Sequence, residues 1–180
     1  PIGEIDNYFK INGLKEIVVN NRGALNVVNG ISSVGNLDLN IANRQKEQTI
    51  KRLLTKGITC SIEVKDMPAF GKGTMVLLLA VFENGQCCYF SLGERGKPSE
   101  DVADEACESF LFFYERNGVM DEFLVDQLLL PLSLCKGASK IITPKITNHI
   151  LTNIDVIMEF LPVEIKVEGD TGNEGIVTID

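Results

Sequence analysis

The sequence predicts a mixed α/β (α+β) protein built from two units. Short segments with the two-residue periodicity of strands recur beside longer segments with helical spacing. Charge also divides the chain: residues 1–97 carry a net charge of +3 and residues 98–180 carry −11, within a total of −8. A loop-forming Gly/Pro-containing segment, Gly93–Pro98, lies between the two regions. We therefore expect one unit over residues 1–94 and a second over residues 95–180.

The first unit is expected to follow the order β-α-β-β-β. Residues 15–28 are rich in Ile and Val and predict a strand, whereas residues 30–40 are polar and turn-like. A helix is expected from Leu39 to Lys56, because Gly57 follows where a helix would stop. Further strands are expected at residues 58–65, 74–82 and 86–92, the last two joined by an Asn-Gly hairpin turn.

The second unit is expected to follow the order α-α-β-α-β-β. Ser99 is placed to cap a helix that runs to Tyr114 or Glu115, with acidic residues in its first turns that suit the helix dipole. A second helix is expected from Asp121 to Cys135, with Pro131 inside it. The remaining elements are a strand at 140–146, a helix at 149–160 and strands at 163–168 and 175–179.

Composition excludes several classes of protein. The longest strictly apolar run, Met75–Phe82, is too short to span a membrane, and the N-terminal residues lack a signal pattern. The net charge of −8 argues against binding nucleic acid over the whole surface. Five cysteines without Cys-x-x-Cys spacing favour free thiols in a reducing compartment. We expect a soluble, cytoplasmic protein (nuclear in a eukaryote) with no membrane partner, and Pro1 in place of Met suggests a processed or partial chain.

His149 is the only histidine and lies at the start of an expected helix. Unpaired amides and the positive dipole end make a helix start favourable for anions such as phosphate. Three lysines precede it in an otherwise acidic half, at positions 136, 140 and 145, where they could steer phosphate. The alternative interpretation is a structural or surface histidine with three solvated lysines.

Asp126 and Gln127 interrupt a strongly apolar helix. A carboxylate can accept hydrogen bonds from ribose hydroxyls, and an amide can read the edge of a base. The alternative is an ordinary polar stripe on the solvent side of the helix. The same helix carries large apolar residues on most sides, which favours burial nearly all round. Since this chain offers too little to cover it, we expect the chain alone to leave an apolar patch exposed, where a partner chain binds.

Three ordered segments resemble the RNA 3'-terminal phosphate cyclase family: Gly93–Glu100, Val119–Leu134 and His149–Phe160, followed by Leu161-Pro162. Residues 12–92 resemble more loosely the small α/β unit inserted in that family, with the insertion beginning near Arg22-Gly23. Family members are roughly twice as long, and their N-terminal half has no counterpart here. The resemblance implies an inserted α/β domain followed by the last of three repeats, each with two helices on a four-stranded sheet.

The resemblance also implies a chemistry. It makes His149 the nucleophile that attacks the α-phosphate of ATP and holds AMP, which then activates an RNA 3'-phosphate end for closure to a 2',3'-cyclic phosphate. It places Asp126 and Gln127 against the adenosine, and Phe123 where the family often has a tyrosine against the base. ATP and a divalent cation (Mg²⁺ or Mn²⁺) are implied. The metal ligand belongs to the other half of the family's chain, so no metal residue is expected here.

Two other functions stay open at this point. Non-catalytic relatives of the family bind RNA in ribosome assembly, although they lack the histidine motif that His149–Asn153 carries here. The chain could also be an inactive C-terminal fragment. The expected partners are RNA 3'-phosphate ends together with either the N-terminal half of a cyclase or a second copy of this chain.

Overall fold

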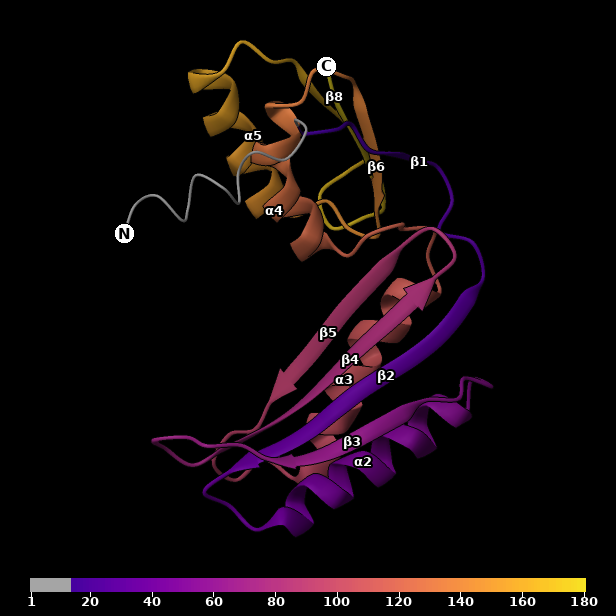
Figure 1. The fold of residues 1–180 in the computed structure, drawn as a ribbon, viewed down its shortest axis with the longest axis vertical. Coiled ribbons are helices and arrows are strands. Elements are labelled where there is room, and N and C mark those ends of the chain that lie inside the picture. Colours follow the sequence, from indigo (N-terminus) through magenta and orange to yellow (C-terminus); the bar gives the residue numbers. More distant parts are fainter. Residues whose placement is uncertain (1–13) are drawn as a thin grey trace, which may run out of the picture. The chain divides into compact units, whose positions relative to one another are not determined.

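The computed structural model describes residues 14–180, which form two compact units (Figure 1). One unit is continuous, from Arg22 to Arg116. The described part of the other consists of residues 14–21 and 117–180. The expected boundary near residue 94 therefore differs from the observed division. The reason is helix α3 (Ser99–Tyr114), which follows the polar loop but packs on the sheet of the continuous unit and shares its core.

The continuous unit is a four-stranded sheet with two helices on one face. Its strands are β2 (Leu25–Gly35), β3 (Ser61–Asp66), β4 (Gly73–Phe82) and β5 (Gln86–Leu92), in the spatial order β3-β2-β4-β5. Helix α2 (Leu39–Leu54) connects the parallel pair β2 and β3, and the other pairs are antiparallel. The expected helix at 39–56 and the hairpin around Asn84-Gly85 are confirmed.

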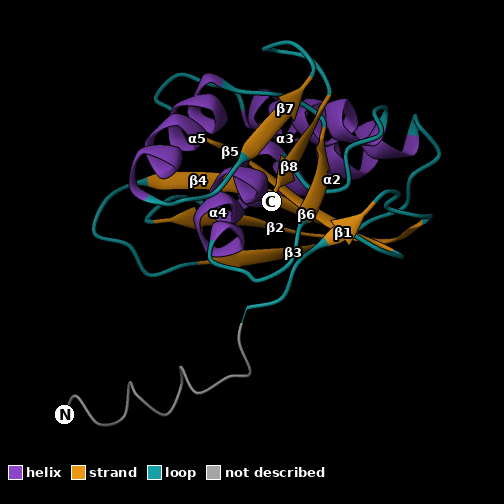
Figure 2. Cartoon of the chain, turned by 90° about the horizontal axis from the view of Figure 1, so that it is seen from above, coloured by secondary structure: helices purple, strands orange, loops and turns teal. Residues whose placement is uncertain are grey.

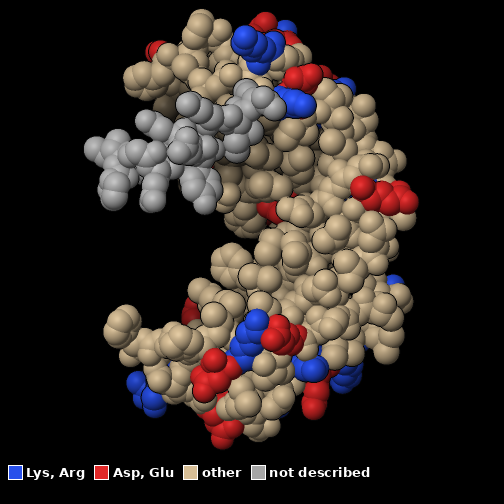
Figure 3. Space-filling model, in the orientation of Figure 1, with Lys and Arg blue, Asp and Glu red and all other residues tan. Residues whose placement is uncertain are grey.

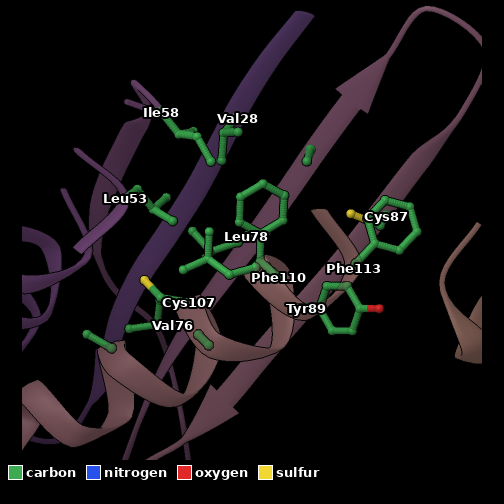
Figure 4. Close-up of a cluster of buried hydrophobic side chains, with 14 of the residues drawn as sticks. Val28, Leu53, Ile58, Val76, Leu78, Cys87, Tyr89, Cys107, Phe110 and Phe113 are labelled. Carbon is green, nitrogen blue, oxygen red and sulfur yellow. The ribbon is translucent and has the colours of Figure 1, made fainter. Parts of the chain in front are cut away.

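The core of this unit lies between the sheet and α2 and α3 (Figure 4). Phe113 packs against Phe82 and Tyr89, with ring centroids 5.7 and 6.2 Å apart. Cys107 is also buried there, and its burial raises the pKa of the thiol to about 12, so it behaves as a small apolar residue. All five cysteines are free thiols, as expected.

The opposite face of the sheet carries rows of apolar side chains. Ile31, Leu77 and Phe90 form one row across three strands. In the space-filling view the surface over β4 and β5 is largely uncharged, and charged groups gather towards β3, where Lys65 pairs with Glu63 (Figure 3). Phe90 and Leu92, on the edge strand β5, are more than half exposed.

The expected strand over residues 15–28 is wrong, because the chain leaves one sheet and enters the other within it. Residues Val18–Val19 form β1 in the discontinuous unit, and Gly23 turns the chain with a positive φ of 77° before β2 begins. The segment expected to be turn-like is mostly β2. Its polar Ser32 is fully buried, yet satisfied, because its hydroxyl hydrogen-bonds to the Ala42 carbonyl and the Gln45 side chain.

Arg22 joins the beginning and the end of the continuous unit. Its guanidinium donates to the carbonyl oxygens of Phe113 (2.9 Å) and Tyr114 (2.6 Å), the last two residues of α3. The same group lies 4.8 Å from the ring centroid of Phe82 and 4.9 Å from that of Phe113. A planar fork with five donors suits this combination of carbonyl and ring contacts. The chain therefore enters and leaves this unit at neighbouring points.

The discontinuous unit is a second four-stranded sheet covered by two helices. Its spatial order is β1-β6-β8-β7, with β6 at Ser139–Thr143, β7 at Ile165–Glu168 and β8 at Gly175–Ile179. Strand β1 pairs with β6 in parallel, as Val18 opposite Lys140 and Val19 opposite Ile141 (Figure 2). Helices α4 (Glu122–Ser133) and α5 (Asn148–Phe160) share a core with one face of this sheet.

Side chains fix the starts of α4 and α5 but not that of α3. Asp121 accepts from the Leu124 amide (2.8 Å), and Thr147 accepts from the Ile150 amide (3.1 Å). The expected cap at Ser99 is wrong: Pro98 occupies the N-cap position without a side-chain hydrogen bond, and Ser99 is the first helical residue. Proline there costs nothing, because the amide it lacks would have no partner within the helix.

Helix α4 is buried on one side, and its other side leaves apolar residues exposed, as the sequence predicted. Val125, Leu129 and Leu132 enter the core. In contrast, Phe123, Leu130 and Leu134 are 55%, 53% and 57% exposed. In this chain, the sheet and α5 cover only one side of α4. Among residues 14–180, no helix combines the length and the apolar character needed to cross a membrane.

Replacing Arg22 by Lys tests its role in closing the continuous unit. The substitution keeps the charge but loses the planar fork, so the carbonyls at the end of α3 lose a hydrogen-bond donor. We expect the free energy of unfolding, measured in urea, to fall by about 1–3 kcal/mol. Arg95→Lys, at an exposed loop position, is the matched control and should change little. Equal effects of the two substitutions would contradict the assignment.

Candidate active site

His149 is the second residue of α5 and follows the capping residue Thr147. The cap uses one of the first amides of the helix, that of Ile150, and helix starts leave further amides for a bound anion. The imidazole itself is 84% exposed. The only histidine of the chain is therefore open to a large substrate, next to a helix start.

Asp126, which is 23 positions earlier in the sequence, lies beside His149. Its Oδ2 is 3.5 Å from the imidazole Nδ1, and its side chain is 22% exposed. Its other oxygen, Oδ1, accepts a hydrogen bond of 2.7 Å from the Nδ2 of Asn153 on α5. The packing of α4 against α5 therefore brings together the two residues that the sequence singled out separately.

Asn153 is a residue of this cluster that the sequence reasoning did not assign. One signal for it was available, because His149 and Asn153 are four residues apart and so share one face of α5. The sequence does not show what Asn153 binds on that face, because its acceptor, Asp126, lies on α4.

A carboxylate beside Nδ1 favours the imidazole form that carries its proton on that nitrogen. The lone pair then lies on Nε2, which is the nitrogen farther from Asp126. A neutral imidazole in this form is a nucleophile without a further base. The cluster can therefore attack an electrophilic atom that approaches from solvent.

Phe123 and Gln127 lie on the outer side of α4, one turn apart, and both are exposed. Helical spacing places them beside Asp126 and away from the buried Val125 and Leu129. An aromatic ring and an amide are the side chains that would stack on a base and hydrogen-bond to its edge. Their assignment to adenosine stays a prediction.

The three lysines do not all lie near the histidine. Lys140 is in β6 between Ser139 and Ile141, which are buried, so it lies on the sheet face opposite α4 and α5. Lys136 follows the end of α4, about 10 Å or more beyond Asp126 along the helix axis. Lys145 alone precedes α5 closely, in the segment that leads to its cap. Steering of phosphate by these lysines stays a prediction, and Lys145 is the one of the three that leads directly into the helix of His149.

A divalent cation finds no protein site in the described residues. Between Leu14 and Asp180, no group of three His, Cys, Asp or Glu side chains could hold a metal ion. The described residues therefore offer no ligand set of their own for the cation that the family resemblance implies.

Comparison with known proteins identifies both units. The family model described as the RNA 3'-terminal phosphate cyclase (RTC) insert domain matches residues 20–115, close to the bounds of the continuous unit. Three curated relatives are named RNA 3'-terminal phosphate cyclase. They come from Methylococcus capsulatus (31% identity, covering 92% of this chain and 46% of the relative), Pyrococcus furiosus (30%, 92% and 48%) and Ralstonia nicotianae (36%, 83% and 42%).

The chain spans slightly less than half the length of these relatives. Its matches include the continuous unit and the helices that carry His149, Asp126 and Asn153, because the alignments cover most of the chain. The family model alone covers more than half of it. The chain belongs to the RNA 3'-terminal phosphate cyclase family.

Proposed function

We propose that this chain supplies the nucleophile of an ATP-dependent RNA 3'-terminal phosphate cyclase, a ligase-class enzyme. The observation that carries the proposal is the exposed imidazole of His149 beside the Asp126 carboxylate, at the start of α5. An exposed histidine with one nitrogen facing a carboxylate and the other directed away from it suits the attack on a nucleotide phosphate.

Three transfers account for the reaction. His149 Nε2 attacks the α-phosphorus of ATP, a P–N bond forms, and the bond to pyrophosphate breaks. An oxygen of the RNA 3'-phosphate then attacks the same phosphorus, which breaks the P–N bond and joins AMP to the RNA end. Finally, the neighbouring 2'-hydroxyl attacks the 3'-phosphorus, loses its proton and expels AMP, which leaves a 2',3'-cyclic phosphate.

The nucleotide would lie over α4, next to the histidine. Phe123 would stack on the adenine, and Asp126 and Gln127 would hydrogen-bond to the adenosine. Asp126 can serve both the imidazole and a ribose hydroxyl, because a carboxylate offers about four acceptor positions. A divalent cation, Mg²⁺ or Mn²⁺, would neutralise charge on the ATP phosphates, with its protein ligands outside the residues described here.

The rest of the active site would come from a partner that covers the outer helix surface. This surface consists of exposed apolar residues that share the sides of α4 and α5 with the site residues: Phe123, Leu130, Leu134, Val156 and Phe160. Contiguous exposed apolar residues are typical of interaction sites. Since the relatives are about twice as long, we propose that their remaining half covers this surface, with a second copy of the chain as the alternative occupant.

Replacing His149 by Ala should abolish transfer of AMP to the protein. The chain, supplied with the N-terminal half of a relative, is incubated with α-labelled ATP and a divalent cation. We expect an acid-labile, base-stable label on the wild type, typical of a histidine phosphoramidate, and none on the variant. The fold should persist, because an imidazole that is 84% exposed contributes little packing. A variant that still carries label would exclude His149 as the nucleophile.

If the wild-type chain carries no AMP label, the two remaining interpretations are favoured: an RNA-binding relative without catalysis, or an inactive fragment. Binding to an RNA with a 3'-phosphate, compared with the same RNA ending in a 3'-hydroxyl, separates those two.

Substituting Asp126 or Gln127 by Ala should weaken the use of ATP by about 1–3 kcal/mol each, the range for a hydrogen-bonding group left without its partner. The measurement is the ATP dependence of label transfer. Leu128→Ala, at the next position of α4, offers a comparison without a polar group. If both polar variants show the ATP dependence of the wild type, Asp126 and Gln127 are ordinary surface residues of the helix and do not bind the nucleotide.

Introducing charge into the outer helix surface should prevent association. Leu130→Glu, at a residue 53% exposed, is compared with Leu92→Glu, at a residue 56% exposed on β5. We expect the chain to bind an apolar-surface dye and the N-terminal half of a relative, and the Leu130 variant to lose both while the Leu92 variant keeps them. Light scattering that shows a monomer with no dye binding would count against the proposed partner.

A further inference from the structure

The carboxylate of Asp126 lies against two residues of one helix. Asn153 Nδ2 donates to Oδ1 at 2.7 Å, and His149 Nδ1 lies 3.5 Å from Oδ2. Because His149 and Asn153 are one turn apart on α5, both face Asp126 across the contact between α4 and α5. The hydrogen bond from Asn153 is the shorter of the two contacts, and it is partly buried.

We propose that Asn153 is a positioning residue for His149 and acts through Asp126. By fixing Oδ1, it sets the rotation of the carboxylate about its terminal bond, so that Oδ2 faces Nδ1. That orientation keeps the imidazole proton on Nδ1 and leaves Nε2 free. The assignment deepens the proposed function, because it states what prepares the nucleophile before ATP binds.

The chemistry of an amide suits this role better than that of a charged donor. A Lys or Arg in place of Asn153 would neutralise Asp126 and weaken its hold on the imidazole proton. The neutral amide leaves the full negative charge of the carboxylate to act on Nδ1. Burial of the Asp126 side chain to 22% exposure strengthens that action, because water screens the contact less than it would at an open position.

A purely structural role for the same hydrogen bond is the competing explanation. Asn153 connects α5 to α4, so its loss could affect the packing of the two helices without any effect on the imidazole. The two explanations differ in one measurable property, the nitrogen that carries the proton in neutral His149.

The test uses NMR of the whole chain, where the single histidine makes assignment unambiguous. Long-range ¹H–¹⁵N correlation in mildly alkaline solution reports which nitrogen of the neutral imidazole is protonated. We expect mainly the Nδ1–H form in the wild type. Asn153→Leu, which keeps similar volume but cannot donate, and Asp126→Ala should both shift the population towards the Nε2–H form. Thr152→Ala, at the exposed neighbouring position of α5, should not.

An Asn153→Leu variant with the wild-type proton distribution would overturn the proposal, and so would a wild type that is mainly Nε2–H. Thermal unfolding of the same samples distinguishes the positioning role from the purely structural one. A purely structural role predicts that Asn153→Leu lowers the melting temperature but leaves the proton distribution of His149 unchanged.

Label transfer from ATP distinguishes failure of this inference from failure of the proposed function. With the N-terminal half of a relative supplied, Asn153→Leu should slow transfer several-fold while the ATP concentration for half-maximal rate stays the same. If the wild type carries no label but the NMR shift occurs, the positioning role stands and the proposed function fails. If the wild type carries label and the variant matches it in rate and NMR signals, the function stands and the positioning role fails.

Discussion

The parallel pairing of β1 with β6 is the constraint on which the rest of the structure depends. Val18 and Val19 lie in the segment just before the continuous unit. They pair with a strand that begins more than a hundred residues later. The Ile17 amide adds a hydrogen bond to the Ser139 hydroxyl at 3.1 Å. Without this pairing, the second sheet would lack its fourth strand, and the continuous unit would no longer lie between two strands of that sheet in the sequence.

An insertion of this kind is compatible with a stable host sheet only if its two ends lie close together. Arg22 meets that requirement, since one guanidinium binds the carbonyls that end α3 and packs on the rings of Phe82 and Phe113. Arg44 of α2 pairs with Glu100 of α3, and Lys56 and Glu115 form a pair just after the ends of the two helices. These two pairs lower the pKa of both glutamates, and because the groups are exposed their effect on stability is small.

The candidate site belongs to the host unit and depends on two helices rather than on a loop. Asp126 is fixed within α4 and Asn153 within α5. The imidazole of His149 lies beside Asp126, one helical turn before Asn153. The core residues beneath, Val125, Ile150 and Ile154, hold the helices on the sheet. The outer sides of the same helices carry exposed apolar residues, so the surface proposed for a partner lies on the two helices that carry the proposed nucleophile and Asp126. Attack on a nucleotide and closure by a partner would thus occur at one place.

The sequence by itself determined the helices, the hairpin, the cysteine state and the residues to examine, because these follow from local periodicity, turn chemistry and rare polar residues. His149 and Asp126 stood out for that reason. Tertiary structure decided the rest. Periodicity cannot show that residues 15–28 divide between two sheets, since both parts are strand-like and only pairing with β6 separates them. It cannot assign α3 to the continuous unit, because that depends on packing against β5 and α2. Nor can it find Asn153, whose acceptor lies on another helix.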